Sequence, residues 1–152
     1  MGTIIIPKSN LKETFLILDD EPEHIFWLVD YIKAQGFHSQ LVTNAQEAID
    51  AVQKNKYIGY IIDLNIPLGG WLPNIKSPNP AYDKYRGFYI AKYVRSQGVS
   101  GAHVIMYSAH SNDEIKNEVS LLYVDYVAKG RAGEFKTALT QMLQKTSNDT
   151  IK

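Results

Sequence analysis

Three aspartates that follow two apolar segments are the side chains of this chain best placed to do chemistry. Asp19 and Asp20 come directly after the apolar run 14–18, and Asp63 comes directly after the apolar run 57–62. In an open parallel sheet, the carboxyl ends of neighbouring strands meet at one edge, and ligands bind there. Carboxylates gathered at such an edge repel one another, and a bound cation relieves the repulsion. Because Mg²⁺ prefers oxygen ligands, the three residues predict a magnesium-dependent phosphate site.

Two further strand ends carry polar groups that could complete this site. Ser108 closes the strand expected at 103–107, and Lys129 closes the strand expected at 123–128. A hydroxyl donor and an ammonium group beside three carboxylates would bind and neutralise phosphoryl oxygens. The histidines lack the spacing of metal ligands, and none of them is assigned to a metal: His24, His38, His103 and His110.

The elements that must position these residues follow from alternating strand and helix patterns. Strands are expected at 14–18, 38–42, 57–63, 103–107 and 123–128. Helices are expected from the acidic turn at 20–23 to about 35, over 45–52 and 87–97, after 111, and over 135–143, with a frayed polar tail at 145–152.

Local capping signals mark where three of these helices should begin. Asp20 stands before a proline and acidic residues, Asn44 and Glu47 form a capping box, and Ser111 with Glu114 should cap the fourth helix. Five strands alternating with five helices predict a doubly wound α/β domain, flavodoxin-like, with a parallel sheet of order 2-1-3-4-5 and helices on both faces. This order places the first and third strands side by side, which brings the three aspartates together.

The bulk composition excludes several classes of function. Lysine and arginine balance aspartate and glutamate at 16 each, so no overall field favours nucleic acid or an anionic membrane as partner. There is no cysteine, which excludes disulfides and thiolate chemistry. No apolar stretch approaches the length of a membrane span, and the first residues lack a signal-peptide layout. We expect a cytoplasmic protein with one domain over 1–152 and a core over about 14–144.

Taken in order, these residues resemble the receiver domain of bacterial two-component response regulators, of the stand-alone chemotaxis-regulator kind. The resemblance covers roughly 14–144, and the gaps from Asp20 to Asp63 and from Ser108 to Lys129 are close to those usual in the family. The residues that carry it are Asp19-Asp20, Asp63-Leu64-Asn65-Ile66-Pro67, Ser108-Ala109, Tyr126 and Lys129.

The resemblance implies how the acidic residues would share the work. Asp63 would be the phosphoacceptor and would also contact the Mg²⁺ cofactor. Asp20 would be the main metal ligand, Asp19 would act through water, and Asn65 would contribute its backbone carbonyl.

The resemblance also implies a signalling role. Lys129 would contact the phosphoryl group, and Ser108 and Tyr126 would form the switch pair that reports phosphorylation to the surface. A histidine kinase or a histidine phosphotransfer protein would supply the phosphoryl group from a phosphohistidine. The chain would then be no enzyme beyond self-phosphorylation and slow self-dephosphorylation at Asp63. Homodimer formation is compatible with the family, and direct DNA binding or membrane binding is not expected of this domain.

Three departures from the family pattern are specific. Gly130 follows Lys129 where the family has a proline joined by a cis bond, and the sequence leaves open which isomer is present here. The glycine that should follow Pro67 closely is matched by Gly87, which implies an insertion over 68–84. The third departure is that we expect no output domain after the last helix in this sequence.

The insertion is too apolar for a simple linker. We expect an ordered flap that covers part of the acidic site or extends the partner-binding rim, against a tolerated surface loop as the alternative. Its apolar and aromatic residues include Trp71, Leu72, Ile75, Tyr82 and Tyr85.

Three other functions compete with a phosphoacceptor. A haloacid-dehalogenase-type phosphatase needs a second aspartate two residues after its nucleophile, and Asn65 and Glu21 stand at the two positions where it would occur. A flavodoxin-like flavin binder needs a phosphate loop after strand one, where acids stand here. A receiver-like interaction domain that works without phosphorylation remains the principal alternative.

Overall fold

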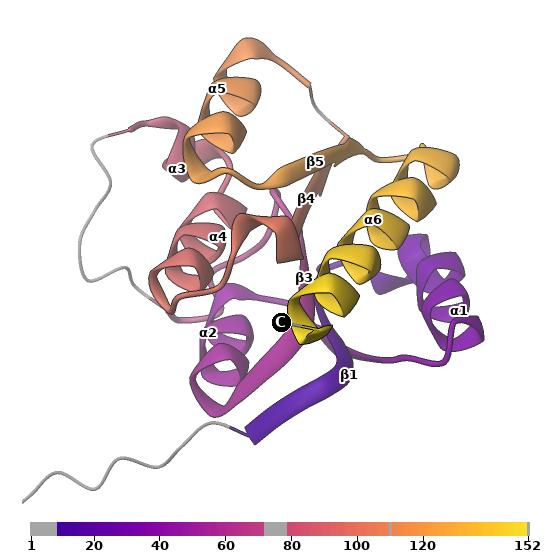
Figure 1. Cartoon of the computed structure of the whole chain (residues 1–152). Helices are drawn as coiled ribbons and strands as arrows, with labels where there is room; N and C mark the ends of the chain where they lie inside the picture. The colour runs from indigo at the N-terminus through magenta and orange to yellow at the C-terminus, as the bar shows by residue number, and fades with distance from the viewer. Residues whose placement is uncertain (1–8, 72–78, 110, 152) are drawn as a thin grey trace, which may run out of the picture.

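The sheet is built from five parallel strands in the order β2-β1-β3-β4-β5, which confirms the predicted fold class (Figure 1). A computed structural model describes residues 9–71, 79–109 and 111–151. The strands are β1 Ser9–Leu18, β2 His38–Val42, β3 Asn55–Asp63, β4 Val104–Ser108 and β5 Asp125–Ala128.

Helices cover both faces of this sheet. Figure 1 shows α1 and α6 on one side of it and α2 and α4 on the other. The α-helices are α1 Phe26–Ala34, α2 Ala45–Lys54, α3 Ala81–Lys84, α4 Gly87–Ser96, α5 Asp113–Leu122 and α6 Ala132–Ile151. Two 3₁₀ turns, η1 Pro22–Ile25 and η2 Gly101–His103, precede α1 and β4.

Alternate residues along the strands belong to two separate hydrophobic cores, one on each face of the sheet. Phe15 and Ile17 of β1 join the core beneath α1 and α6, whereas Leu16 and Leu18 join the core beneath α2, α4 and α5. A strand buried on both faces reads as an unbroken apolar run, because side chains point alternately to the two faces. These apolar runs end where the polar residues begin, at one edge of the sheet.

The strand register brings those polar ends to one place. Leu18 of β1 is level with Ile62 of β3, so the residues that follow each of them leave the sheet side by side. Asp63 is level with Tyr107 of β4, and Ser108 is level with Ala128 of β5.

Several strand boundaries differ from the sequence expectation. β1 and β3 begin at Ser9 and Asn55, and they pair there across an irregularity between Leu11 and Phe15. The polar residues of 9–13 interrupt the apolar run, which is why periodicity missed this extension. His103 lies in η2, so β4 begins one residue later than expected.

Two of the three expected helix caps are wrong. The turn after Asp20 is a 3₁₀ helix preceded by Glu21, without a side-chain cap. The cap of α5 is Asn112, whose side chain accepts from the amide of Ile115, and not Ser111. The capping box of α2 is confirmed, since Asn44 accepts from the Glu47 amide at 2.9 Å.

Two helix ends also differ. Tyr123, expected to open strand five, ends α5 with a φ of 58°, so β5 starts at Asp125. α6 continues to Ile151, whereas a frayed tail was expected from 145. Its apolar face ends near Leu143, so the periodic pattern gave no signal for the residues beyond it.

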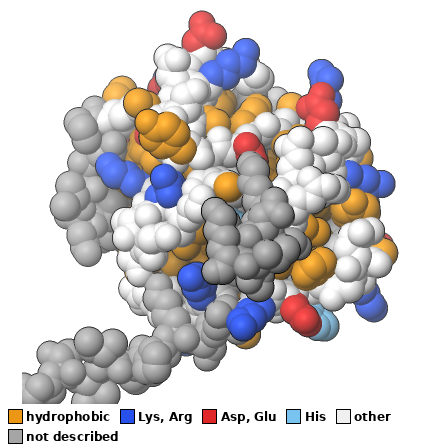
Figure 2. Space-filling model, viewed as in Figure 1, with side chains coloured by type: hydrophobic (Ala, Val, Ile, Leu, Met, Phe, Trp, Pro, Cys, Tyr) orange, Lys and Arg blue, Asp and Glu red, His pale blue; other side chains and the backbone are white. Residues whose placement is uncertain are grey.

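The surface carries charges of both signs. On the face shown in Figure 2, basic and acidic side chains are scattered among apolar and uncharged ones. Within the described residues, no helix is both long and apolar enough to cross a membrane.

Candidate functional site

The three aspartates predicted at the strand ends form one cluster. Asp19, Asp20 and Asp63 each offer a carboxylate oxygen, and these oxygens lie within 4.8 Å of one another. Asp19 and Asp63 are 1% exposed, whereas Asp20 is open to solvent. The parallel strands β1 and β3 produce this arrangement, because the acids follow residues that are paired in register.

Both carboxylate oxygens of Asp63 are held by donors. The backbone amide of Asn65 donates to Oδ1 at 3.0 Å, and the ammonium of Lys129 donates to Oδ2 at 2.9 Å. Burial nevertheless outweighs these two contacts and raises the pKa of Asp63 to about 6, with the charge of Asp19 adding to the rise. Asp63 is therefore a buried carboxylate that keeps its charge at neutral pH only with help from neighbouring cations.

Lys129 is the cation closest to the cluster. Its Nζ lies 2.9 Å from Asp63 Oδ2 and 3.9 Å from Asp19 Oδ2. Burial alone would lower the pKa of Lys129, but the hydrogen bond to Asp63 and the charges of Asp63, Asp19 and Asp20 raise it overall. The Lys129 side chain thus stays charged and compensates part of the acidic cluster.

Asp19 is fixed by two donors of its own. Tyr107 donates its hydroxyl to Oδ2 at 2.5 Å, and the backbone amide of Glu21 donates to Oδ1 at 2.7 Å. Sequence reasoning missed Tyr107, because an aromatic residue inside an apolar strand reads as core. The available signal was its hydroxyl, since a buried tyrosine usually needs a hydrogen-bond partner and Ser108 marks the strand end.

Ser108 and Tyr126, predicted as a switch pair, lie together. Ser108 is fully buried, and its backbone oxygen accepts from the Lys129 amide at 2.9 Å. The same oxygen lies 3.4 Å from the Tyr126 hydroxyl, which donates to it. The pair therefore adjoins the acidic cluster through the backbone of Lys129, and its switching role stays a prediction.

Gly87 contacts the backbone of the strand end that carries Asp63. Its amide donates to Leu64 O at 3.0 Å. A Cβ at this position would lie 2.3 Å from Asp63 O, which is closer than any side-chain carbon is found. Only glycine fits here, in agreement with the sequence match between Gly87 and the family glycine. The Lys129–Gly130 bond is trans, since the described residues contain no cis peptide bond.

The described part of the predicted insertion packs on α4 and α5. Tyr82 and Asn79 both donate to the buried carboxyl group of Glu118 on α5, Asn79 at 3.0 Å; we call these three residues the Glu118 network. Tyr85 accepts from the Asn112 side chain at 3.0 Å and lies near Phe88 of α4. The segment 79–85 is thus ordered, while Leu72, Ile75 and His110 fall outside the described residues.

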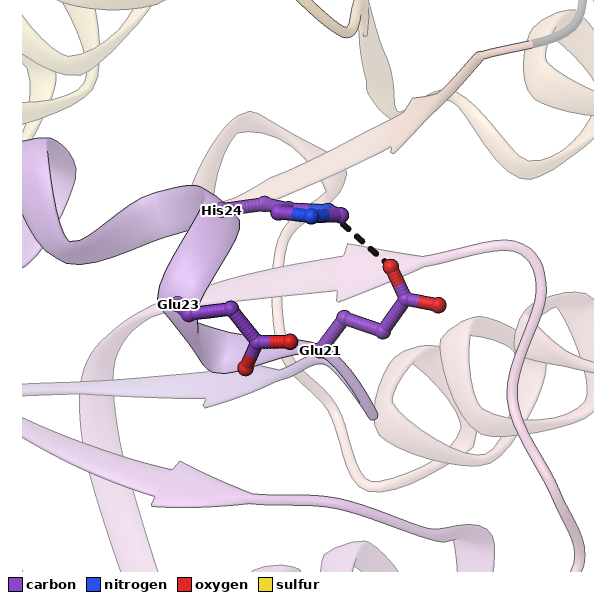
Figure 3. Close-up of side chains that lie close together, drawn as sticks. All are labelled: Glu21, Glu23 and His24. Carbon is purple, nitrogen blue, oxygen red and sulfur yellow. Dashed lines mark ion pairs between the residues drawn. The ribbon is translucent and has the colours of Figure 1, made fainter.

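A second group of potential ligands lies just beyond Asp20. Figure 3 shows Glu21, Glu23 and His24 at the start of the first helical turn, with His24 Nδ1 3.0 Å from Glu21 Oε2. All three side chains are exposed. Exposed carboxylates are well solvated, so this group has no need of a cation to compensate its charge.

The donor set of the aspartate cluster fits Mg²⁺. Among the described residues, three carboxylates face a single lysine, so the cluster carries an excess of negative charge beside two buried aspartates. Hard oxygen donors, one of them solvent-exposed, suit an ion that keeps several of its waters.

The fold that carries this site is shared with solved structures. No family model matches the sequence, and no curated protein matches it either. Solved structures do match: a signal receiver domain from Vibrio parahaemolyticus is 17% identical, with a TM-score of 0.69 over 93% of this chain and 98% of that chain. The chain has the receiver-domain fold.

Other receivers superpose comparably. A two-component response regulator from Clostridium difficile is 16% identical, with a TM-score of 0.66 over 88% of this chain and 97% of that chain. The response regulator TrrA from Thermotoga maritima, solved in complex with Mg²⁺ and BeF, is 20% identical, with a TM-score of 0.63 over 86% of this chain and 98% of that chain. At such identities the receiver fold is shared, and the roles of individual residues must be argued from the site.

Proposed function

We propose that this chain is a phosphoacceptor module of a two-component phosphorelay, and that Asp63 accepts a phosphoryl group from a phosphohistidine. One observation carries the proposal: Asp63 is a buried carboxylate at a strand end, paired with Lys129 and gathered with Asp19 and Asp20. The receiver fold supports it, because this fold places such a cluster at the ligand-binding edge of the sheet.

The chemistry asked of Asp63 is nucleophilic attack by its carboxylate. An Asp63 oxygen forms a bond to phosphorus while the bond between phosphorus and the histidine nitrogen breaks, and the released imidazole is protonated from solvent. Lys129, 2.9 Å from Asp63 Oδ2, would turn to the phosphoryl oxygens and neutralise part of their charge. Little acid–base work is needed, since phosphoryl transfer depends mainly on positioning and charge.

Mg²⁺ would be held by Asp20, by Asp63, by the backbone carbonyl of Asn65 and, through water, by Asp19, and it would neutralise phosphoryl charge. The neighbour TrrA, solved with Mg²⁺ and BeF, supports this assignment by likeness of fold. Ser108 and Tyr126 would carry the outcome to the surface, because the backbone oxygen of Ser108 accepts from both the Lys129 amide and the Tyr126 hydroxyl. The partner would be a histidine kinase or a histidine phosphotransfer protein.

The direct test uses a small phosphodonor and intact mass. The chain is incubated with Mg²⁺ and acetyl phosphate or phosphoramidate, and the mass of one phosphoryl group should appear; no such mass should appear when the metal is chelated before the donor is added. Asp63→Asn should abolish it, because the amide is no nucleophile. Asp50→Asn, on the exposed face of α2, is the matched control and should be phosphorylated like the parent. A phosphoprotein from Asp63→Asn refutes the acceptor assignment.

A second candidate is an interaction domain that works without phosphorylation. The Glu118 network favours it, since this network fixes part of α5 by contacts that do not involve Asp63. The same mass experiment separates the two candidates, because the interaction domain would gain no phosphoryl group from either donor at any Mg²⁺ concentration.

A further inference from the structure

Tyr107 contacts both Asp19 and Lys129, and the proposed chemistry assigns it no role. It is the strand neighbour of Asp63, level with it in the β3–β4 register. Its side chain is 1% exposed and packs edge-on against Phe135 of α6, with ring centroids 5.7 Å apart. The ring therefore has one orientation, and its hydroxyl reaches the acidic cluster.

The hydroxyl of Tyr107 saturates one side of Asp19. It donates to Oδ2 at 2.5 Å, while the amide of Glu21 donates to Oδ1 at 2.7 Å. Burial, followed by the charge of Asp19, raises the pKa of Tyr107. The phenol thus remains protonated and can serve Asp19 as a donor. Each carboxylate oxygen of Asp19 consequently accepts a hydrogen bond from an uncharged donor, and neither bond requires a cation.

The ring of Tyr107 supports Lys129. The Lys129 ammonium lies 5.2 Å from the ring centroid, within the range of a cation–π contact. From there it reaches Asp63 Oδ2 at 2.9 Å and stays 3.9 Å from Asp19 Oδ2. The lysine thus lies closer to the carboxylate that has no neutral side-chain donor than to the one that Tyr107 already serves.

We propose that Tyr107 is a positioning residue that directs Lys129 to Asp63 by satisfying Asp19 in its place. The consequence for phosphorylation rests on the proposed function, whereas the consequence for metal binding does not. Without the hydroxyl, Asp19 would draw Lys129 away from Asp63. Asp19 and Asp63, which would then share one lysine and lack the hydroxyl donor, would together present a less compensated charge to any divalent cation.

Tyr107→Phe tests this because it keeps the ring and removes only the hydroxyl. A hydrogen bond to a charged group has a large effect, so we expect Mg²⁺ to bind about three- to tenfold more tightly, measured by calorimetry. At saturating Mg²⁺, phosphorylation by phosphoramidate should be about tenfold slower, since Lys129 is now shared between two carboxylates. A purely structural role would weaken both together. Tyr60→Phe is the control, because it removes a buried hydroxyl of β3 that pairs with the Tyr57 amide, and it should change neither.

The Asp19→Asn background shows whether Tyr107 acts through Asp19. In this background, Tyr107→Phe should no longer alter Mg²⁺ affinity. If it alters the affinity as much as it does in the parent, the proposal is overturned. Affinity that falls or stays constant in Tyr107→Phe alone, while circular dichroism shows a native fold, overturns it as well. If the parent binds Mg²⁺ but is never phosphorylated, the proposed function fails, and the affinity comparison still decides the role of Tyr107.

Discussion

Replacing Asp63 by asparagine should stabilise the metal-free protein. The substitution keeps the shape of the side chain and removes a buried charge that the fold accommodates poorly. Burial raises the pKa of Asp63 from its ordinary value of 3.8 to about 6, although Lys129 and the Asn65 amide both act to lower it. The neutral form of the side chain is therefore the one that the folded protein prefers, and asparagine resembles that form.

The size of the stability difference, and the pH range over which it develops, follow from these two pKa values. Because the folded pKa lies above the ordinary one, the folded state holds a proton between about pH 4 and pH 6 that the unfolded state has released. The free energy of unfolding of the parent therefore falls as pH rises through this window. Above about pH 6 the loss is about 3 kcal/mol, since one pKa unit corresponds to about 1.4 kcal/mol. For a domain of this size, that amounts to a rise in Tm of about 6–12 °C for Asp63→Asn at pH 7.5. Below about pH 4 both proteins carry a neutral side chain, and the difference should vanish.

Calorimetric and urea unfolding across this pH range, in buffer with chelator, measure the effect. Saturating Mg²⁺ should stabilise the parent more than the variant and narrow the gap, because the ion compensates the charge that asparagine lacks. Asp50→Asn, which alters an exposed carboxylate, should follow the parent at every pH. A variant no more stable than the parent at pH 7.5 without metal would show that the buried charge of Asp63 does not destabilise the folded protein.

Three further outcomes can be measured. Asp20→Ala should weaken Mg²⁺ binding in calorimetry more than Asp19→Ala does, because the Asp19 oxygens are already engaged by protein donors; equal losses would contradict this division. Tyr82→Phe should lower the free energy of unfolding in urea by about 1–3 kcal/mol, since the buried Glu118 loses one of its donors, and an unchanged midpoint would argue against that contact. Gly87→Ala places a carbon 2.3 Å from Asp63 O, so it should destabilise the fold and slow phosphorylation; wild-type values in both assays would show that the contact can relax.

The fold and the core of the site could be predicted because both depend on local rules. Apolar runs identified the strands, and polar residues at the ends of parallel strands must meet at one edge. Asp63 and Lys129 were identified in this way, although neither residue alone indicates a functional site. Their direct contact was not predicted; it arises because Lys129 follows β5 and reaches across β4 to the end of β3.

The misses come from residues whose tertiary context overrides their local appearance. Tyr107 looked like packing, because nothing in the sequence shows that its hydroxyl reaches a residue 88 positions away. Nothing in the sequence shows that Glu118 is buried, or that it accepts from Tyr82 of α3, 36 positions away. Asn112 and Ser111 are both good caps, and only the backbone of the loop decides between them.

The Glu118 network makes two distant segments interdependent. Residues 79–85 bring two donors, Tyr82 and Asn79, and α5 brings the one buried acceptor that both require. Transplanting the loop alone into another protein of this fold would leave the buried Tyr82 hydroxyl without its acceptor, and transplanting α5 alone would leave the Glu118 carboxyl group without these two donors. The loop and the helix can therefore be exchanged between proteins only together, so that they behave in recombination as a single module encoded in two separate places.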